Sequence, residues 1–390
     1  MAKENAGKTV LDLASAQVKI VAALAAVTLA FNLYTCWQAY RRAPLREAAS
    51  RPLLAASSSY FFDSGMAEPV PVFAVKALAA AGLDPDTAVR AGGMAAWAAC
   101  SLLLFLLLRR RCGDLAGLLA GMFAAMNPYL GFYAMQGDSH LFALVFLLPF
   151  WHFADPKALT PERAALAGLL AGLACLGRLD SCWFALLVLA LYGALARSRA
   201  WLKAAALTLG VALLVCAPYL AWQKARTGNF LYAQELSLRR WANLEKYGPR
   251  PEVPVETAPL SAAGFVFRDG ALAAARGAFS GLGRSLSYEA PKVVYYKLII
   301  VMAFVGFYAA FALKFDALLV LAAAAYLPVL PMAALPEVHP DGGLSLRYYL
   351  PMLCALCALA GAGFQELLRW LLDELGAIPK EEAGKIPGRK

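Results

Sequence analysis

Two carboxylates in a short polar segment are the first residues of this chain that could do chemistry. Asp63 and Glu68 lie between Ser57 and Pro69, and long apolar stretches follow on the C-terminal side. An ionised group near membrane depth costs free energy unless it is paired or used, so we interpret Asp63 as functional. Glu68 has a second interpretation, because Pro69 is a typical first helical residue and a carboxylate stabilises a helix N-terminus.

Two short turns later in the chain contain further polar pairs. The first holds Asp138 and His140, and the second holds Arg178 and Asp180. Asp138 is also well placed to be the N-cap of the next helix, so capping and substrate contact both fit the pattern. Arg178 and Asp180 form either a self-satisfied ion pair or part of an anion site.

A last polar cluster precedes the final apolar stretch. Arg347 and Tyr348 are candidate substrate contacts, but they are also typical of a membrane interface, where Arg snorkels and Tyr joins an aromatic belt. Acidic and basic groups together at a lipid interface suit a substrate with a phosphate head and a lipid tail. A divalent cation could bind beside His140 or His339, but we assign no metal ligands and no cofactor.

The elements that must position these residues are membrane-spanning helices. Of the 390 residues, 61% are apolar and 16% are charged, whereas about 25% are charged in a typical soluble domain. Crossing a bilayer takes roughly 20 apolar residues of helix. We therefore predict an all-α, polytopic membrane protein with about ten transmembrane helices. The predicted spans are Ile20–Tyr40, Ala91–Leu108, Leu115–Gly137, Ser139–Ala154, Ala164–Gly177, Ser181–Ala196, Ala204–Gln223, Leu298–Leu313, Ala317–Pro336 and Tyr348–Phe364.

The distribution of Lys and Arg predicts that both termini are cytoplasmic. Basic residues concentrate in the short loops that this orientation places inside, which follows the positive-inside rule. These residues are Arg109, Arg110, Arg111, Lys157, Arg163, Arg197, Arg199, Lys203 and Lys314. The net charge of +10 is explained by this topology and by anionic lipid, and no segment is typical of a nucleic-acid-binding module.

The same topology places all the polar clusters on the extracytoplasmic face. It gives one domain over residues 1–370, with a first outer loop at 41–90 and a long outer loop at 224–297. The first loop contains a predicted interfacial helix over Ala43–Ala56, and the long loop is large enough to form a lid of short helices. Residues 371–390 form a predicted cytoplasmic, disordered tail.

The order of these motifs resembles the GT-C membrane glycosyltransferases. Among them, the chain is most similar to the protein O-mannosyltransferases and the aminoarabinose and lipopolysaccharide sugar transferases. The resemblance covers about residues 15 to 370. The segments that carry it are Asp63-Ser64-Gly65, Glu68-Pro69, Gly137-Asp138-Ser139, Gly177-Arg178-Leu179-Asp180, Thr227-Gly228-Asn229-Phe230 and Leu346-Arg347-Tyr348-Tyr349-Leu350-Pro351.

This resemblance implies an inverting transfer of one sugar from a polyprenyl-phosphate donor to a lipid, glycan or protein hydroxyl. The implied setting is the extracytoplasmic face of a bacterial-type inner membrane. The implied catalytic residues are Asp63 and Glu68, with Asp63 preferred as base. Because the two acids are five positions apart rather than adjacent as in the family, the resemblance leaves open which one takes the proton. The implied substrate contacts are Asp138, His140, Arg178, Asp180, Arg347 and Tyr348.

Two other functions are compatible with a polytopic chain of this kind. A transporter or flippase of a lipid-linked sugar would be expected to carry ionisable residues near mid-membrane and an internal repeat, and the sequence shows neither. An inactive relative that serves as a subunit of a complex is the other alternative, and Asp63 argues against it.

Overall fold

The computed structural model describes residues 23, 25–45, 51–58, 68–158, 160–247, 261–329 and 346–375. Asp63 and His339 lie outside these ranges, as does most of the predicted tail. The described part of the chain is helical and contains no β-strand, which confirms the all-α prediction. After a helix over residues 25–40, the elements in chain order are α2 (Arg51–Ser57), α3 (Pro69–Ala80), α4 (Pro85–Cys112), α5 (Asp114–Met126), α6 (Pro128–Met135), α7 (Ser139–Phe153), η1 (Pro156–Ala158), α8 (Pro161–Gly177), α9 (Ser181–Ala196), α10 (Arg199–Thr227), α11 (Tyr232–Tyr247), α12 (Ala262–Val266), α13 (Ala271–Arg284), η2 (Ser285–Glu289), α14 (Ala290–Val294), α15 (Lys297–Ala312), α16 (Asp316–Tyr326), η3 (Leu346–Tyr349) and α18 (Leu350–Glu374).

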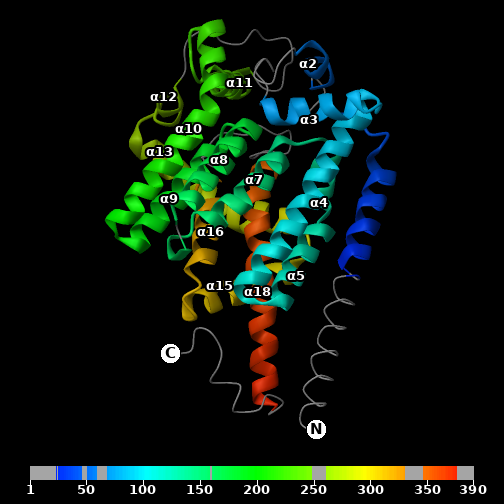
Figure 1. The fold of residues 1–390 in the computed structure, drawn as a ribbon, viewed down its shortest axis with the longest axis vertical. Helices are drawn as coiled ribbons and strands as arrows, with labels where there is room; N and C mark the ends of the chain where they lie inside the picture. Colours follow the sequence, from blue (N-terminus) through cyan, green and yellow to red (C-terminus); the bar gives the residue numbers. More distant parts are fainter. Residues whose placement is uncertain are drawn as a thin grey trace.

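Helix α18 forms the centre of the bundle and packs against α5, α15 and α16 (Figure 1). Its N-terminal two thirds are buried among apolar side chains from most of the other helices. Helix α15 approaches it at backbone contact, because a Cβ atom on Gly306 would collide with the carbonyl oxygen of Leu359. Glycine is therefore required there by close helix packing.

Local sequence signals set the helix boundaries. Asp84 caps α4 by accepting hydrogen bonds from the backbone N–H groups of Asp86 and Thr87. Asn127 caps α6 in the same way and breaks the predicted span at 115–137 into α5 and α6, which are bent by 55°. Its side-chain amide also donates to the carbonyl oxygens of Val293 and Val294, and so attaches α14 to the bundle.

Every predicted span coincides with a helix over most of those of its residues that the structure describes, which for the ninth span end at 329, but few of these helices are long. Three are long and apolar enough to cross a membrane alone, namely α4, α10 and η3 with α18, and two bent pairs raise the number to five within the described residues. The remaining apolar helices include α7 with 15 residues and α9 with 16 residues. The helices at the predicted spans are present, but only three to five of them, within the described residues, are long enough to cross a membrane.

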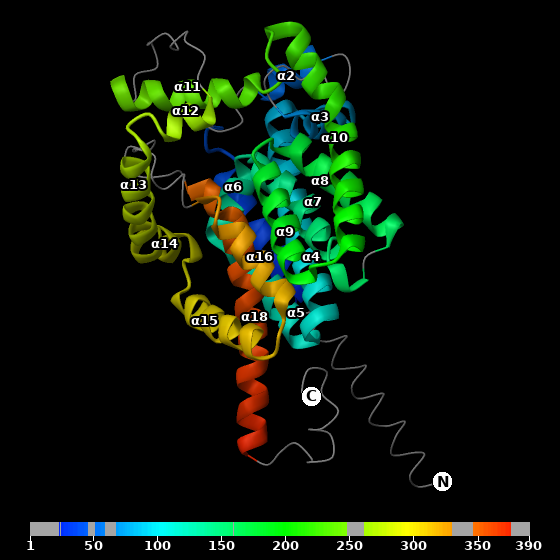
Figure 2. The same cartoon turned by 90° about the vertical axis from the view of Figure 1, so that its left-hand side faces the viewer.

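The bundle has two distinct ends. Helices α7 and α9 run in one direction and α8 runs back between them, so the α8–α9 turn predicted at Arg178–Asp180 lies beside the start of α7. Helices α2, α3 and α11 lie at this same end (Figure 2). The described parts of the predicted long loop contain α11 to α14 and are mostly helical, while the role of this loop as a lid stays a prediction.

Candidate active site

The candidate site is built from helix ends. It lies where the start of α3, the start of α7, the α8–α9 turn and the start of α18 meet. Helix ends carry unpaired backbone groups and allow polar side chains to gather without interrupting a span. This arrangement brings together the predicted clusters around Glu68, Asp138, Arg178 and Tyr348.

Asp138 and His140 form a buried pair. Asp138 is the N-cap of α7 and its Oδ1 lies 2.8 Å from the backbone nitrogen of His140 and 2.9 Å from the ring Nδ1. Burial acts to raise the pKa of Asp138, but His140 and the Arg178 guanidinium outweigh it and hold this pKa below its usual value. The predicted cap is confirmed, and the same carboxylate also orients the imidazole.

Arg178 connects the second turn to the first. Its Nε lies 2.8 Å from Oδ2 of Asp180, and its Nη1 donates to the hydroxyl of Ser139 at 3.1 Å. Burial acts to lower the pKa of Arg178, but Asp180, Tyr348, Glu68 and Asp138 outweigh it and the pKa is raised. The predicted ion pair therefore exists, and it belongs to a larger network.

Tyr348 provides an aromatic surface within this network. The imidazole of His140 meets its ring edge-on at 5.1 Å between centroids, and the guanidinium of Arg178 lies 5.2 Å from the ring centroid. Arg347 lies over the same ring at 5.3 Å. Tyr348 is buried, so it packs inside the protein and does not belong to an exposed aromatic belt.

Glu68 occupies the N-cap position of α3, but its side chain makes no capping hydrogen bond. Its carboxylate instead interacts electrostatically with Arg51 and Arg178. The geometry thus favours the interpretation of Glu68 as a site residue over that of a helix cap. Asp63 lies five residues before it, outside the described residues.

The sequence analysis missed Arg51 as a member of this site. Arg51 is 8% exposed, and it donates a hydrogen bond to the carbonyl oxygen of Gly137. Burial lowers its pKa, while Glu68 and Asp138 act in the opposite direction. A signal was present, because Arg51 is a charged residue directly before Pro52 in an otherwise apolar helix start.

Gly137 explains why the first turn can accept Arg51. Its φ of +64° lies in the left-handed region, which favours glycine. A Cβ atom at this position would also collide with Val89 of α4. The turn before Asp138 therefore requires glycine for both reasons.

The donor set does not indicate a metal site. Within the residues that the structure describes, no group of three or more His, Cys, Asp or Glu side chains could hold a metal ion. Asp138 and Asp180 are engaged with cationic or imidazole partners.

Comparison with solved structures identifies the fold. The chain superposes on ArnT from Cupriavidus metallidurans in its crystal structure bound to undecaprenyl phosphate, with a TM-score of 0.58 and 16% identity over 90% of this chain and 60% of that one. The apo crystal structure of the same ArnT gives a TM-score of 0.56 at 16% identity over the same shares of the two chains. The chain therefore shares the GT-C-like helical fold of these two structures.

The match covers only part of the ArnT chains. The chain spans about 60% of the length of the ArnT structures it matches. Searches against protein-family models and against curated proteins found no match. The GT-C-like fold expected from the motif order is thus confirmed, while the specific branch stays a prediction.

Proposed function

We propose that this protein is a membrane glycosyltransferase. It transfers a sugar from a polyprenyl-phosphate donor to a hydroxyl of a lipid, glycan or protein acceptor at the extracytoplasmic face of the membrane. The observation that carries this proposal is the cluster of two guanidiniums, the buried Arg51 and the partly buried Arg178, beside the carboxylates Glu68, Asp138 and Asp180 at one end of a GT-C-like bundle. The ArnT structure bound to undecaprenyl phosphate supports a lipid-phosphate donor by analogy of fold.

The proposed reaction is a single inverting displacement. The acceptor oxygen attacks the anomeric carbon while the bond from that carbon to the phosphate oxygen breaks. The acceptor proton passes to a carboxylate, and the polyprenyl phosphate leaves with the bonding electron pair. No general acid is needed, since the phosphate is already a good leaving group, unlike the alcohol leaving group of glycoside hydrolysis.

We assign the proton acceptor to Asp63, with Glu68 as the alternative. Glu68 is the alternative because its carboxylate makes no capping bond and interacts with Arg51 and Arg178. Arg347 and Arg178 are the proposed phosphate contacts, since a positive charge that holds the phosphate in the bound donor holds it more strongly as negative charge develops. Asp138, His140, Asp180 and Tyr348 position Arg178 and the donor sugar.

Binding of the polyprenyl phosphate tests the proposed phosphate contact of Arg347 directly. Wild-type protein in nanodiscs should bind undecaprenyl phosphate, and Arg347→Ala should bind it at least about tenfold more weakly, as expected for one lost charge-assisted contact. Lys203→Ala, an exposed position on α10, serves as the control and should bind like wild type. Equal binding by all three proteins would remove Arg347 from the donor site. Movement of a lipid-linked sugar across the membrane without transfer would favour a flippase instead.

A further inference from the structure

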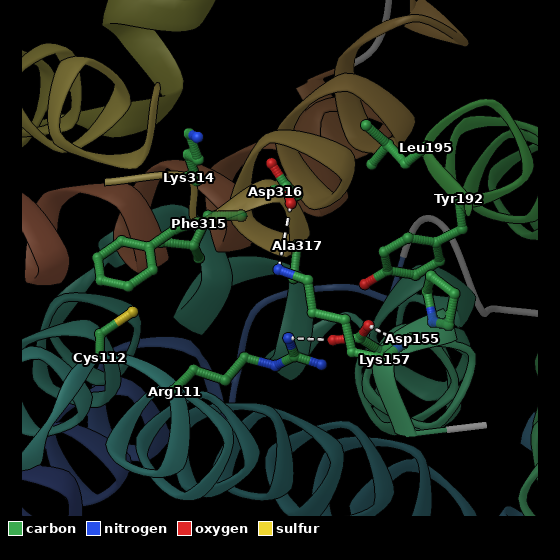
Figure 3. A pocket seen from close by; sticks show the side chains of 12 residues that line it. Arg111, Cys112, Asp155, Lys157, Tyr192, Leu195, Lys314, Phe315, Asp316 and Ala317 are labelled. Atoms are coloured by element: carbon green, nitrogen blue, oxygen red, sulfur yellow. Dashed lines mark hydrogen bonds and ion pairs between the residues drawn. The ribbon is translucent and has the colours of Figure 1, made fainter. Parts of the chain in front are cut away.

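A cavity lined by both charged and apolar side chains lies at the end of the bundle opposite the candidate active site. It has a volume of about 330 Å³ and lies between the C-terminal ends of α4 and α9, the loop after α7, and the start of α16 (Figure 3). Helix α7 links the two regions, with Asp138 at its start and Asp155 just after its end. Its 15 residues span about 22 Å at 1.5 Å per residue, so this cavity is separate from the candidate active site.

The charged side chains of this cavity are held to different degrees. Arg111 is fixed, because its Nη1 lies 2.7 Å from Oδ2 of Asp155 and its guanidinium lies 4.7 Å from the ring centroid of Trp151. Lys157 pairs with Asp316 at 3.2 Å, but their side chains are 69% and 35% exposed. An exposed pair of this kind contributes only about 0–1 kcal/mol, so an incoming anion can replace Asp316 at little cost.

Lys314 adds a third positive charge at the rim of the cavity. It is exposed, and no ion pair or hydrogen bond of its side chain is seen within the described part of the chain. Its φ of +55° lies in the left-handed region, where a non-glycine residue is strained. The lining therefore has a net charge of +1, from three basic and two acidic side chains: Arg111, Lys157, Lys314, Asp155 and Asp316.

The start of α16 strengthens this positive field. Ala317 and Leu318 line the cavity, and the N-cap residue Phe315 supplies no side-chain hydrogen bond. The first N–H groups of a helix without a capping side chain attract anions through the helix dipole. The carboxylate of Asp316 in the first turn already interacts favourably with this helix dipole. Because its ion pair with Lys157 is exposed, an incoming anion can take its place beside Lys157.

The remaining wall is apolar and reaches the protein surface. Tyr192, Leu195 and Phe315 line it, and Leu195 is 52% exposed. A purely soluble anion makes no use of such a wall, whereas the glycerol backbone and first methylene groups of a lipid do. Basic pockets between spans at the cytoplasmic side are suited to anionic headgroups. The predicted topology places Arg111, Lys157 and Lys314 on that side.

We propose that this cavity is a binding site for a phosphate group, separate from sugar transfer, and that its ligand is the headgroup of an anionic phospholipid. Lys157 and Lys314 contact the phosphate, Arg111 gives a fixed background charge, and Leu195 with Phe315 contacts the lipid backbone. Its volume lies within the roughly 300–1,000 Å³ typical of small-molecule sites. The site does not depend on the proposed function.

Lipid titration of the purified, full-length protein tests the proposal. Native mass spectrometry would follow binding of short-chain phosphatidylglycerol, with phosphatidylcholine as the zwitterionic comparison. Lys157→Gln/Lys314→Gln removes two charges from exposed positions and leaves the Arg111 pair intact. Lys203→Gln is the matched control, because it removes an exposed lysine predicted to lie on the same face. Lys314→Glu is a second variant that reverses charge.

The expected result is one saturable phosphatidylglycerol site in the wild type. The double variant should weaken it by at least about tenfold, given roughly fivefold for each lysine near an anionic headgroup, while Lys203→Gln changes nothing and phosphatidylcholine does not compete. Competition by millimolar inorganic phosphate would identify the ligand as the free anion, and its absence would identify the lipid. Equal phosphatidylglycerol affinity for the wild type, the double variant and Lys314→Glu would overturn the proposal.

Discussion

Arg178 and Arg111 allow the proposed donor contact to be separated from a structural role. Both are largely buried and paired with a carboxylate, Arg178 with Asp180 at 2.8 Å and Arg111 with Asp155 at 2.7 Å. Both guanidiniums also lie over an aromatic ring, at 5.2 Å and 4.7 Å from its centroid. They lie at opposite ends of the bundle, and only Arg178 belongs to the candidate active site.

Replacement of either arginine by lysine keeps the charge and removes the forked geometry. In Arg178→Lys the ammonium can no longer bond Asp180 and Ser139 in the same way and reach a phosphate. One charge-assisted hydrogen bond contributes about 1.5–3 kcal/mol, which corresponds to a loss of about 10- to 150-fold in donor affinity. Arg111→Lys should lower the free energy of unfolding by a similar amount, about 1.5–3 kcal/mol, the contribution of one charge-assisted hydrogen bond. It should leave donor affinity unchanged.

The assay measures two quantities on the same nanodisc preparations. Equilibrium binding of undecaprenyl phosphate reports the donor site, and the midpoint of thermal unfolding reports stability. If the two variants lost stability and donor affinity in parallel, Arg178 would be a structural residue. Full donor affinity in Arg178→Lys would refute the proposed phosphate contact.

Three further predictions follow from the same geometry. Glu68→Gln should lower sugar transfer, and any loss of stability should come from its lost charge interaction with Arg51 and Arg178, because its side chain makes no capping bond; full transfer by this variant would remove Glu68 from the chemistry. Because the pKa of Asp138 is lower in the folded protein than its ordinary value of 3.8, its ionised form stabilises the fold above that pH, and this contribution should be lost as the pH falls below it; Asp138→Asn should flatten this acid limb in unfolding curves. Impermeant thiol reagents should label a cysteine at Ser57, an exposed position of α2, from outside and one at the exposed Arg110 only after permeabilisation, and the reverse pattern would invert the topology.

Much of the fold was predictable from local patterns, because apolar stretches and capping residues act over one or two turns. Pro69 starts α3 and Asp138 caps α7, as expected. The break at Asn127 was not predicted, because an Asn-Pro step inside a continuous apolar run is a weak local signal. Its role becomes visible only with the contact to α14, which is distant in sequence.

The sequence predicted the candidate site as separate polar clusters. The contacts that join these clusters could not be predicted from it. The motif order indicated that Asp138, His140, Arg178 and Tyr348 share one face, and the structure joins them by direct contacts. Periodicity cannot show which helix ends meet, so the inclusion of Arg51 was missed. The cavity at the opposite end was missed for the same reason, since its basic residues served only as topology signals.

Sugar transfer by Asp63→Asn protein tests the central claim most directly. The amide keeps the shape and hydrogen-bonding reach of the carboxylate but cannot accept the acceptor proton. Transfer from a polyprenyl-phosphate sugar should therefore fall by roughly 100-fold or more, with donor affinity unchanged. Full turnover by Asp63→Asn would contradict the assignment and transfer the role to Glu68, and loss of transfer together with donor affinity would show that Asp63 holds the donor and is not its base.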